Sequence, residues 1–549
     1  MDFPGASTGP GQYSMTSPFN LSQLVGQFLL GRNGTHVPDG WPSERIGDWV
    51  LGRHPSLPGI RLLGHDDQVV GWLLGYPIDG KGKLWDGKEL IRFPGLAEFT
   101  SSRAEEFIYG FGGRFLVALV GVRQPRIYLD PCGSLSVVYC AHLEVVASTP
   151  NLVPYDEQTR DRVDLAREMR IPDTNAMYPL ELTPRHNVER LLPNHYLDLS
   201  GWQRVRHWPT GSLQCDGSVE EAVATVAEIT KRQISAIVSR HPTYLRLTSG
   251  GDSRMLLACG RNVADRLELF TVPIPDDGAY LDTAIARKIA KRLRLRHYVP
   301  KYQKSKREDL DRYMFRIGYS TGELRGWETT TMFQQANPRY AQLDGAIGAL
   351  ERGAWYKIND TESTRITPER LLEHCNAPRS EVTLEPLQRW LEQVPAIDSL
   401  QLLDLFYLEQ RLGCWAGVLP YAEGGDPGFV IFPMCHREII TRMLTLPTPY
   451  RVSGFHACEI THSGGPPFMK AIIEREWPEL LAWPFNEPTG VMHLTLAVRR
   501  ARRGLSSSAS RAWQGFTRQA VRVGRDCATP RGGGSGSGIA SPDREDRCL

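Results

Sequence analysis

The sequence lacks long apolar runs and paired cysteines. No stretch of about 18 consecutive apolar residues occurs in its 549 residues, so we expect no transmembrane helix. The opening Met1-Asp2-Phe3-Pro4-Gly5 has neither a basic segment nor an apolar core, which argues against a secretory signal peptide. The 10 cysteines form no Cys-x-x-Cys pair, which argues against a zinc site and a disulfide scaffold. Free thiols are typical of a reducing cytoplasm, where we expect the protein to reside.

The sequence also lacks a strong charge of either sign. Its 64 basic and 62 acidic residues leave a formal net charge of +2, which gives no general attraction to nucleic acid or to acidic membranes. We therefore expect neither as a partner. With 41% hydrophobic and 23% charged residues, the composition is that of a globular chain, long enough for about two to four domains.

Composition and periodicity divide the chain into four parts. Residues 1–20 are rich in Gly, Ser and Pro, so we expect them to be disordered. Residues 21–208 are predicted to form a first domain with its linker, and residues 209–490 a second. Residues 491–549 contain a basic cluster at 499–503, interpreted as a solvated helix face, and end in a Gly/Ser-rich tail that is expected to be flexible.

The first domain is expected to consist of short antiparallel strands. Apolar and β-branched segments alternate with turn residues there, which is typical of stacked sheets. The predicted strands lie at residues 69–75, 114–120, 126–129, 137–139 and 145–148.

The second domain shows an alternation of strands and helices. Ser218 with Glu221 forms a capping box, and apolar residues at helical spacing follow it. The alternation predicts a parallel sheet with helices on both faces, whose ligand lies at the carboxyl ends of the strands. Strands are predicted at 243–248, at 267–272 and near 297–299, helices from 252 and over about 280–293, and a mostly helical region beyond about 365.

The segment Thr248-Ser249-Gly250-Gly251-Asp252-Ser253 follows the first of these strands and opens a helix. Glycines let the backbone turn tightly and bring its N–H groups to an anion, and a helix N-terminus adds partial positive charge. Asp252 is the candidate ligand for a magnesium ion between phosphates, because hard oxygen ligands suit that ion. The spacing is too short for a Walker loop, and no Lys follows the glycines. An ordinary strand–turn–helix corner would carry the same residues, so the motif alone leaves both interpretations open.

This loop resembles the PP-loop of ATP pyrophosphatases, whose usual pattern is Ser-Gly-Gly-x-Asp-Ser; Thr248 stands at the Ser and Ser249 at the first Gly. The order of further motifs resembles the asparagine synthase-like family, which joins a glutaminase-type sandwich to a PP-loop synthetase domain. The resemblance covers about residues 65–485. Its motifs lie at 111–115, 128–134, 146–148, 247–254, 270–272, 281–287, 345–353, 407–413 and 437–440.

The resemblance implies both a fold and a reaction. The fold class is α/β and β, with an N-terminal antiparallel β-sandwich of degenerate Ntn type and a PP-loop domain, similar to adenine nucleotide α hydrolases, whose parallel sheet precedes a helical C-terminal part. The implied reaction turns a substrate carboxylate into an acyl-adenylate, from which an amine displaces AMP to form an amide. ATP and Mg²⁺ are the implied cofactors, a small-molecule or peptide carboxylate is the implied substrate, and the family allows a homodimer.

The resemblance also implies a set of site residues. Backbone N–H groups from Ser249 to Ser253 would bind pyrophosphate, Asp252 would bind magnesium, and Leu247 with Val272 would hold the adenine side. Asp252, Glu351 and Lys470 are the catalytic candidates. The implied nucleotide-binding residues are Leu247, Thr248, Ser249, Gly250, Gly251, Asp252, Ser253, Val272, Gly345 and Gly348.

The N-terminus departs from the family. The family's glutaminase uses a Cys exposed at position 2, whereas this sequence has Asp2, and its first cysteine is Cys132. A terminal thiol is needed there because its own amine serves as the base. We therefore expect no glutaminase activity, a sandwich that is a structural remnant, and free ammonia or a substrate amine as the nucleophile, as in the similar β-lactam synthetases and lasso-peptide cyclases.

The synthetase part departs from the family at three points. The acidic pair of its second loop falls on Ala349 and Leu350, so Glu351 either substitutes for the pair or forms an ion pair with Arg352 or another surface charge. The late catalytic Lys is missing around Pro484, and Lys470 matches a structural position better than the catalytic one. Met434-Cys435 stands where a Leu-Asp pair is common.

These departures leave a rival function open. A non-catalytic homologue that binds a nucleotide or a partner protein would show the same replacements. A PP-loop enzyme acting on tRNA is a third interpretation, against which the missing Cys-x-x-Cys pair and the low net charge argue. His195, expected in a turn, and His297, expected before a strand, are interpreted as hydrogen-bonded structural residues.

Overall fold

The computed structural model describes residues 19–496 except 65–66, 88, 94–100, 215, 324–327, 329–338, 358, 425–427, 449, 451–466, 487, 489–491 and 494–495. The chain divides into two compact units, Met1–Glu487 and Pro488–Leu549. The elements below lie in the first unit, which spans the residues of both expected domains up to residue 487. The disorder expected at the N-terminus falls on residues 1–18, which lie outside the described residues, as do the basic cluster at 499–503 and the Gly/Ser-rich tail.

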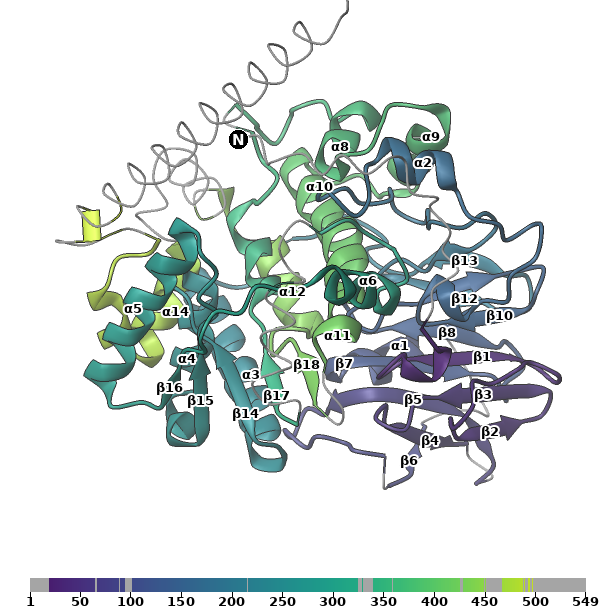
Figure 1. Ribbon diagram of the computed structural model, residues 1–549, viewed down its shortest axis with the longest axis horizontal. Coiled ribbons are helices and arrows are strands. Elements are labelled where there is room, and N and C mark those ends of the chain that lie inside the picture. The colour runs from purple at the N-terminus through teal and green to yellow at the C-terminus, as the bar shows by residue number, and fades with distance from the viewer. Residues whose placement is uncertain are drawn as a thin grey trace, which may run out of the picture. The chain divides into compact units, whose positions relative to one another are not determined.

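Two largely antiparallel sheets form the first part of this unit (Figure 1). The first has six strands in the order β11-β9-β10-β1-β3-β2, and the second has seven in the order β13-β12-β8-β7-β5-β4-β6, with β6 parallel to β4. All five strands predicted in this region are present, so the expected antiparallel architecture is confirmed. The bounds are β1 (Phe28–Arg32), β2 (Ser43–Ile46), β3 (Trp49–Arg53), β4 (Gly59–Leu63), β5 (Val69–Ile78), β6 (Ile91–Arg92), β7 (Gly112–Leu119), β8 (Arg126–Leu129), β9 (Val138–Cys140), β10 (Val145–Ala147), β11 (Glu189–Arg190), β12 (His195–Asp198) and β13 (Gln203–Arg206).

Strand β5 is apolar on both faces because each face packs against a hydrophobic cluster. Trp72 and Leu74 point to one side and belong to a core shared with Phe28 and other residues of the six-stranded sheet. Leu73 points to the other side and packs in a second cluster with Ile108 of helix α1 (Ser101–Tyr109). Both faces are therefore covered, and every residue of the strand after Val69 is buried.

The third sheet is parallel and has the strand order β16-β15-β14-β17-β18. In chain order this is 3-2-1-4-5, so the direction of winding reverses between β14 and β17, and ligands of open α/β sheets bind at such a switch point. The predicted alternation of strands and helices is confirmed here. The strands are β14 (Thr243–Arg246), β15 (Leu267–Phe270), β16 (His297–Tyr298), β17 (Ala341–Leu343) and β18 (Phe429–Ile431).

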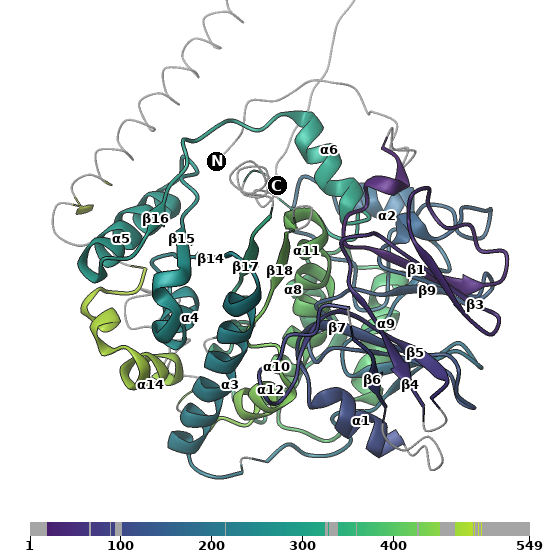
Figure 2. The same ribbon diagram turned by 90° about the horizontal axis from the view of Figure 1, so that it is seen from below.

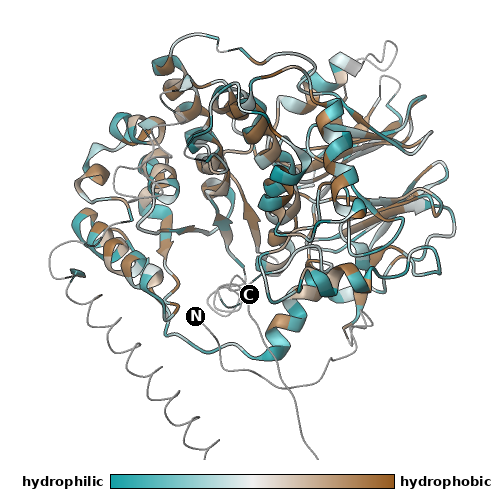
Figure 3. Cartoon of the chain, turned by 90° about the horizontal axis from the view of Figure 1, so that it is seen from above, coloured by the Kyte–Doolittle hydropathy of each residue, from teal (hydrophilic) through white to brown (hydrophobic). Residues whose placement is uncertain are grey.

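Helices surround the parallel sheet. The capping box predicted at Ser218 and Glu221 is present at the start of α3. Helices α4, α12 and α14 each pack against α3, α14 also packs against α4, and the four lie along one side of the sheet in Figure 2. Figure 3 shows hydrophilic and hydrophobic residues alternating along the helices, as expected when one helix face is buried. The described helices that follow α1 along the chain, α2 lying in the first part, are α2 (Val163–Glu168), α3 (Val219–Arg240), α4 (Gly251–Cys259), α5 (Asp277–Leu293), α6 (Arg307–Arg316), α8 (Pro368–Cys375), α9 (Glu381–Gln393), α10 (Ser399–Phe406), α11 (Gly417–Glu423), α12 (Arg437–Leu444) and α14 (Pro467–Glu476).

A buried ion pair links the sandwich to the helical region. Glu409 lies on the π-helix η6 (Tyr407–Ala416) and is fully buried. Arg206 of β13 donates to both of its carboxylate oxygens, at 2.7 and 2.8 Å. The indole N–H of Trp390 and the amide of Asn194 donate to the same carboxylate. A charge this well hydrogen-bonded is stable in the interior, and it fixes the two parts against each other.

The structure corrects the expectation for His195. His195 opens strand β12 and does not lie in a turn; its ring is buried, and the Pro193 carbonyl lies 2.8 Å from its Nδ1. Burial, with Arg206 and Arg204 nearby, lowers the pKa of His195 well below its usual value, which agrees with a structural role.

In the described part of the chain, no helix is both long enough and apolar enough to cross a membrane.

Candidate functional site

The loop from Thr248 to Ser253 lies at the carboxyl end of β14, the central strand of the parallel sheet. The Ser253 hydroxyl accepts a hydrogen bond from the Thr248 N–H at 3.0 Å and lies 2.9 Å from the Thr248 hydroxyl. The Thr248 hydroxyl oxygen also accepts the Gly250 N–H at 3.1 Å. These bonds hold the loop in one tight conformation.

Helix α4 begins at this loop without a side-chain cap. Its N-cap residue is Gly250, and no side chain bonds to the first helical N–H groups from that position. Such N–H groups have no partner within the helix, and they carry the positive end of its dipole. An uncapped helix start at a switch point favours the binding of an anion such as phosphate.

The loop after β17 lies directly against Asp252. A Cβ atom added at Gly345 would come within 3.1 Å of the Asp252 Cβ, and one at Gly348 within 3.0 Å of its Oδ1. Side chains at these two positions would crowd the carboxylate, so the glycines permit the close approach. The structure therefore brings Gly345, Gly348 and Asp252 together.

An arginine pairs with Asp252. The Arg352 Nη1 donates to Asp252 Oδ1 at 3.1 Å, and the two side chains are 29% and 28% exposed. Burial raises the pKa of Asp252, Arg352 opposes this rise, and Asp344 adds to it. The candidate metal ligand thus already has a cationic partner from the second loop.

The carboxylate of Asp282, on helix α5, contacts the loop from Thr248 to Ser253. Asp282 Oδ1 accepts the Ser249 N–H at 2.8 Å and the Ser249 hydroxyl at 2.6 Å. Burial raises the pKa of Asp282, and the two bonds from Ser249 act against that rise. A loop that offers N–H and O–H donors to a carboxylate offers the same donors to a phosphate oxygen.

The Arg254 side chain holds the loop in place through hydrogen bonds to backbone carbonyls. Its side chain is fully buried and donates to the backbone carbonyls of Ser249, Trp483 and Pro484. The Asn486 N–H donates to the same Ser249 carbonyl at 3.1 Å. The segment around Pro484 therefore binds the Arg254 side chain through its backbone carbonyls.

Glu351 does not form the surface ion pair considered for it. Its side chain is fully buried, and neither carboxylate oxygen accepts a hydrogen bond of ordinary geometry from the described residues. Burial raises the pKa of Glu351 well above its usual value, although Arg352 and the Met469 amide act in the opposite direction. Arg352 pairs with Asp252 instead, so Glu351 is an interior residue beside the site.

Lys470 lies on α14, next to the ring of Phe485. Its Nζ is 5.9 Å from that ring centroid, and the Arg254 guanidinium lies over the same ring at 4.3 Å. The neighbouring Met469 side chain reaches the second loop, where a Cβ at Gly348 would meet its Cε at 3.3 Å. Lys470 thus belongs to the packing beside the loops.

Leu247 and Val272 follow adjacent strands, β14 and β15, and both are buried. The Leu247 carbonyl accepts the Thr271 hydroxyl at 2.7 Å, and that hydroxyl lies 2.9 Å from the His297 Nε2. Burial lowers the pKa of His297 to about 4. His297 lies on strand β16 rather than before it, and its neutral ring agrees with a structural role.

The donor set around the loop decides how a magnesium ion would fit. The side chains of Ala349 and Leu350 offer no oxygen ligand, and the carboxylate of Glu351 is buried. Among the described residues, one group of three side chains could together hold a metal ion, and it consists of Asp130, Cys132 and Cys435, away from this loop. Asp252 lies outside that group, and its carboxylate, with the carboxylate of Asp344 nearby, suits an ion that is also held by phosphate oxygens and water.

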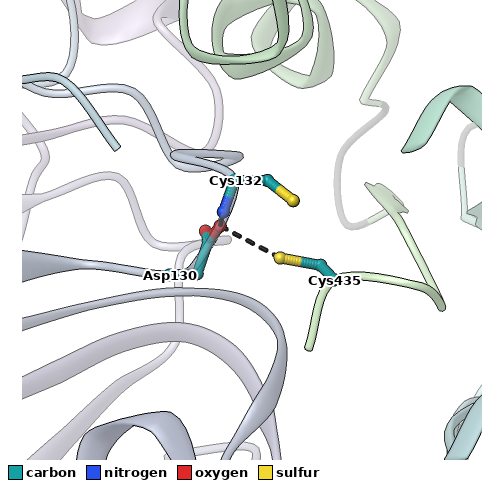
Figure 4. Close-up of side chains that lie close together, drawn as sticks. All are labelled: Asp130, Cys132 and Cys435. Carbon is teal, nitrogen blue, oxygen red and sulfur yellow. Dashed lines mark hydrogen bonds between the residues drawn. The ribbon is translucent and has the colours of Figure 1, made fainter. Parts of the chain in front are cut away.

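Cys132 and Cys435 occupy the boundary between the sandwich and the parallel sheet. Cys132 is buried in the turn after β8, and burial raises the pKa of its thiol. The Cys435 thiol donates to Asp130 Oδ1 at 3.1 Å (Figure 4). Cys435 thus places a thiol against the sandwich.

No protein-family model and no curated protein matches this chain. Among solved structures it is similar to an NMN synthetase from Francisella tularensis, with 9% sequence identity and a TM-score of 0.19 over 35% of this chain and 93% of that one. A likeness this weak carries no argument about fold or function.

Sequence reasoning missed three residues of the site. The contact of Arg352 with Asp252 could not be predicted from a local pattern, because the two residues are 100 positions apart in the chain. Asp282 lies in a family-like segment, but nothing there indicates that it contacts Ser249. Arg254 follows the loop motif and looks like an exposed helix residue, whereas the fold buries it completely.

Proposed function

We propose that the loop from Thr248 to Ser253 binds the phosphates of an adenine nucleotide, and that the chain is an ATP-dependent synthetase. The observation that carries the proposal is the uncapped start of α4 at the switch point of a parallel sheet. In the proposed reaction a substrate carboxylate attacks the α-phosphate of ATP, pyrophosphate leaves, and ammonia or a substrate amine displaces AMP to form an amide.

The residues of the site have separate roles in this proposal. The N–H groups from Ser249 to Ser253 bind pyrophosphate oxygens, and the Ser249 hydroxyl turns from Asp282 to the phosphate. Leu247 and Val272 form an apolar surface that contacts the adenine base. Gly345 and Gly348 keep the second loop close to Asp252.

Charge neutralisation is assigned to two residues. Arg352 is the guanidinium nearest to Asp252, and it replaces part of the positive charge that the family draws from a late lysine. Asp252 would hold a magnesium ion brought in with the nucleotide. That ion would neutralise phosphate charge during the departure of pyrophosphate.

A second candidate function is a non-catalytic nucleotide-binding protein. The pairing of Arg352 with Asp252, together with apolar residues at 349 and 350, favours it. Such a protein would bind ATP at the same loop without turnover. Asp252 would then serve only as the partner of Arg352.

Two measurements on the full chain separate these functions. Calorimetric titration with MgATP tests nucleotide binding, and exchange of labelled pyrophosphate into ATP with a panel of carboxylic acids tests adenylation. Binding with exchange supports the synthetase, and binding without exchange for any acid supports the second candidate. The absence of binding would refute both.

A further inference from the structure

We propose that Asp130, Cys132 and Cys435 form a zinc site that joins the sandwich to the parallel-sheet part of the chain. Their ligand atoms all lie within 4.8 Å of one another, and all three residues are buried. Figure 4 shows the two thiols and the carboxylate close together, with Asp130 and Cys132 on one segment and Cys435 on another. The site does not depend on the proposed nucleotide chemistry.

The sequence conceals this group. Cys132 lies two residues after Asp130, but Cys435 is 305 residues from Asp130 along the chain. The absence of a Cys-x-x-Cys pair argues against a zinc site only when ligands are close in sequence. Here the turn after β8 and the turn after β18 supply them together.

Asp130 is held in place by several donors. Its Oδ1 accepts the N–H groups of Cys132 and Ser134, each at 3.0 Å. Its Oδ2 accepts the Ser134 hydroxyl at 2.7 Å and the N–H groups of Phe115 and Leu135 at 3.2 and 3.3 Å. Hydrogen bonds of this kind orient a ligating carboxylate and commonly surround metal sites.

Cys435 is held by the sandwich as well. The Gly113 N–H donates to the Cys435 carbonyl at 2.9 Å, and the adjacent His436 forms a bridge with Gly112. The thiol therefore reaches Asp130 from a fixed backbone. Its position does not depend on a long flexible side chain.

The chemistry of the ligands suits zinc. Zinc is borderline soft and binds thiolates at about 2.3 Å and carboxylate oxygens at about 2.0–2.2 Å, which sets two bound sulfurs about 3.8 Å apart. Because the two sulfurs already lie within 4.8 Å of each other, they need to approach by at most about 1 Å to bind the same zinc ion. Three protein ligands leave the fourth position of the tetrahedron to a water molecule or another small ligand.

The local charges also suit a dication. Binding converts two thiols to thiolates and releases two protons, so the ligands then carry three negative charges. Zinc supplies two positive charges, and the buried Arg437, which interacts electrostatically with both thiols, supplies the third. The three ligand charges are therefore compensated by the zinc ion together with two buried guanidiniums, because Arg114 interacts electrostatically with Asp130.

The test uses the purified full chain without a histidine tag. Zinc content after equilibration with zinc and dialysis should be about one per chain in the wild type. Cys132→Ser and Cys435→Ser should each lose it, whereas Cys259→Ser, which removes a buried thiol outside the group, should retain it. Calorimetry in buffers of different ionisation enthalpy should show release of about two protons per zinc, and affinity should fall by up to about 100-fold per pH unit of acidification.

Contrary outcomes are equally clear. The proposal is wrong if the wild type binds no zinc, if both serine variants bind it as tightly as wild type, or if mass spectrometry finds a Cys132–Cys435 disulfide in the untreated protein. Should a serine variant fail to fold, cobalt substitution of the wild type decides. A thiolate-to-cobalt absorption band supports the site, and its absence refutes it.

Discussion

Arg352 and Asp252 form an ion pair across the two loops of the candidate site, with Nη1 3.1 Å from Oδ1. The pair joins the start of α4 to the end of the second loop, and both side chains keep part of their surface in solvent. A guanidinium here is close to the position where phosphate charge would collect. The functions proposed above differ chiefly in what happens to this pair when nucleotide arrives.

The first prediction concerns Arg352. If its guanidinium contacts phosphate, Arg352→Gln should weaken ATP binding by about tenfold or more, because a charge-assisted hydrogen bond is lost. Calorimetric titration measures the effect. Arg307→Gln, which removes an exposed guanidinium paired with Asp311, is the matched control and should change nothing. Unchanged or tighter binding in Arg352→Gln would show that the arginine only blocks Asp252.

The second prediction concerns Asp282, whose carboxylate takes the Ser249 donors. Asp282→Asn keeps an acceptor but removes a negative charge next to the incoming phosphates, so ATP affinity should rise by about tenfold. Burial raises the pKa of Asp282, so acidification should protonate it and strengthen ATP binding in the wild type. The variant should lack that part of the pH dependence. Weaker binding in Asp282→Asn would show that the carboxylate supports the loop rather than competing with phosphate.

The third prediction concerns Arg254, which donates to three backbone carbonyls around the loop. Arg254→Lys cannot reproduce the planar fork, and it should lower the free energy of unfolding by about 2–3 kcal/mol. Urea denaturation measures this loss. ATP affinity should fall at a temperature where the variant is still folded. Full stability in the variant would mean that the three carbonyls find other donors.

The fourth prediction concerns Glu423, a buried residue that pairs with Arg246 at 3.8 Å and accepts a bond from Gln342 at 3.1 Å. Burial raises its pKa from 4.5 to about 7. Between these values the folded state holds a proton that the unfolded state has lost. The free energy of unfolding should therefore fall by about 3 kcal/mol as the pH rises from 4.5 to about 7, and level off above.

Glu423→Gln removes the titrating group and should flatten this part of the stability profile. Glu168→Gln, a change at an exposed carboxyl, should leave the slope as in the wild type. Denaturation at a series of pH values gives both profiles. An identical slope in Glu423→Gln and wild type would contradict the assignment.

The sequence predicted those parts of the fold that local patterns determine. Strands β5, β7 and β8 are apolar and bounded by turn residues, and α3 carries its own capping box. Strand β13, Gln203–Arg206, was missed because three of its four residues are polar or charged, as is common at a sheet edge. Its strand conformation depends on pairing with β12, which no local pattern reveals.

The candidate site was predictable where one segment builds it. The loop from Thr248 to Ser253 is recognisable because glycines and a helix start are adjacent in sequence. Its contacts with Arg352 and Asp282 come from chain segments far from the loop, and single-sequence periodicity carries no record of such pairs. The burial of Glu351 was equally hidden, since the residue lies beside charged Arg352 and looks exposed.

The most direct test of the account compares wild type with Asp252→Asn in MgATP binding and pyrophosphate exchange. Asparagine keeps the size of the side chain but removes its charge, so the variant should stay folded with nearly unchanged stability. The account predicts exchange with some carboxylic acid in the wild type and its loss in Asp252→Asn, with Asp311→Asn as the unaffected control. Equal nucleotide affinity and equal exchange in wild type and Asp252→Asn would contradict it.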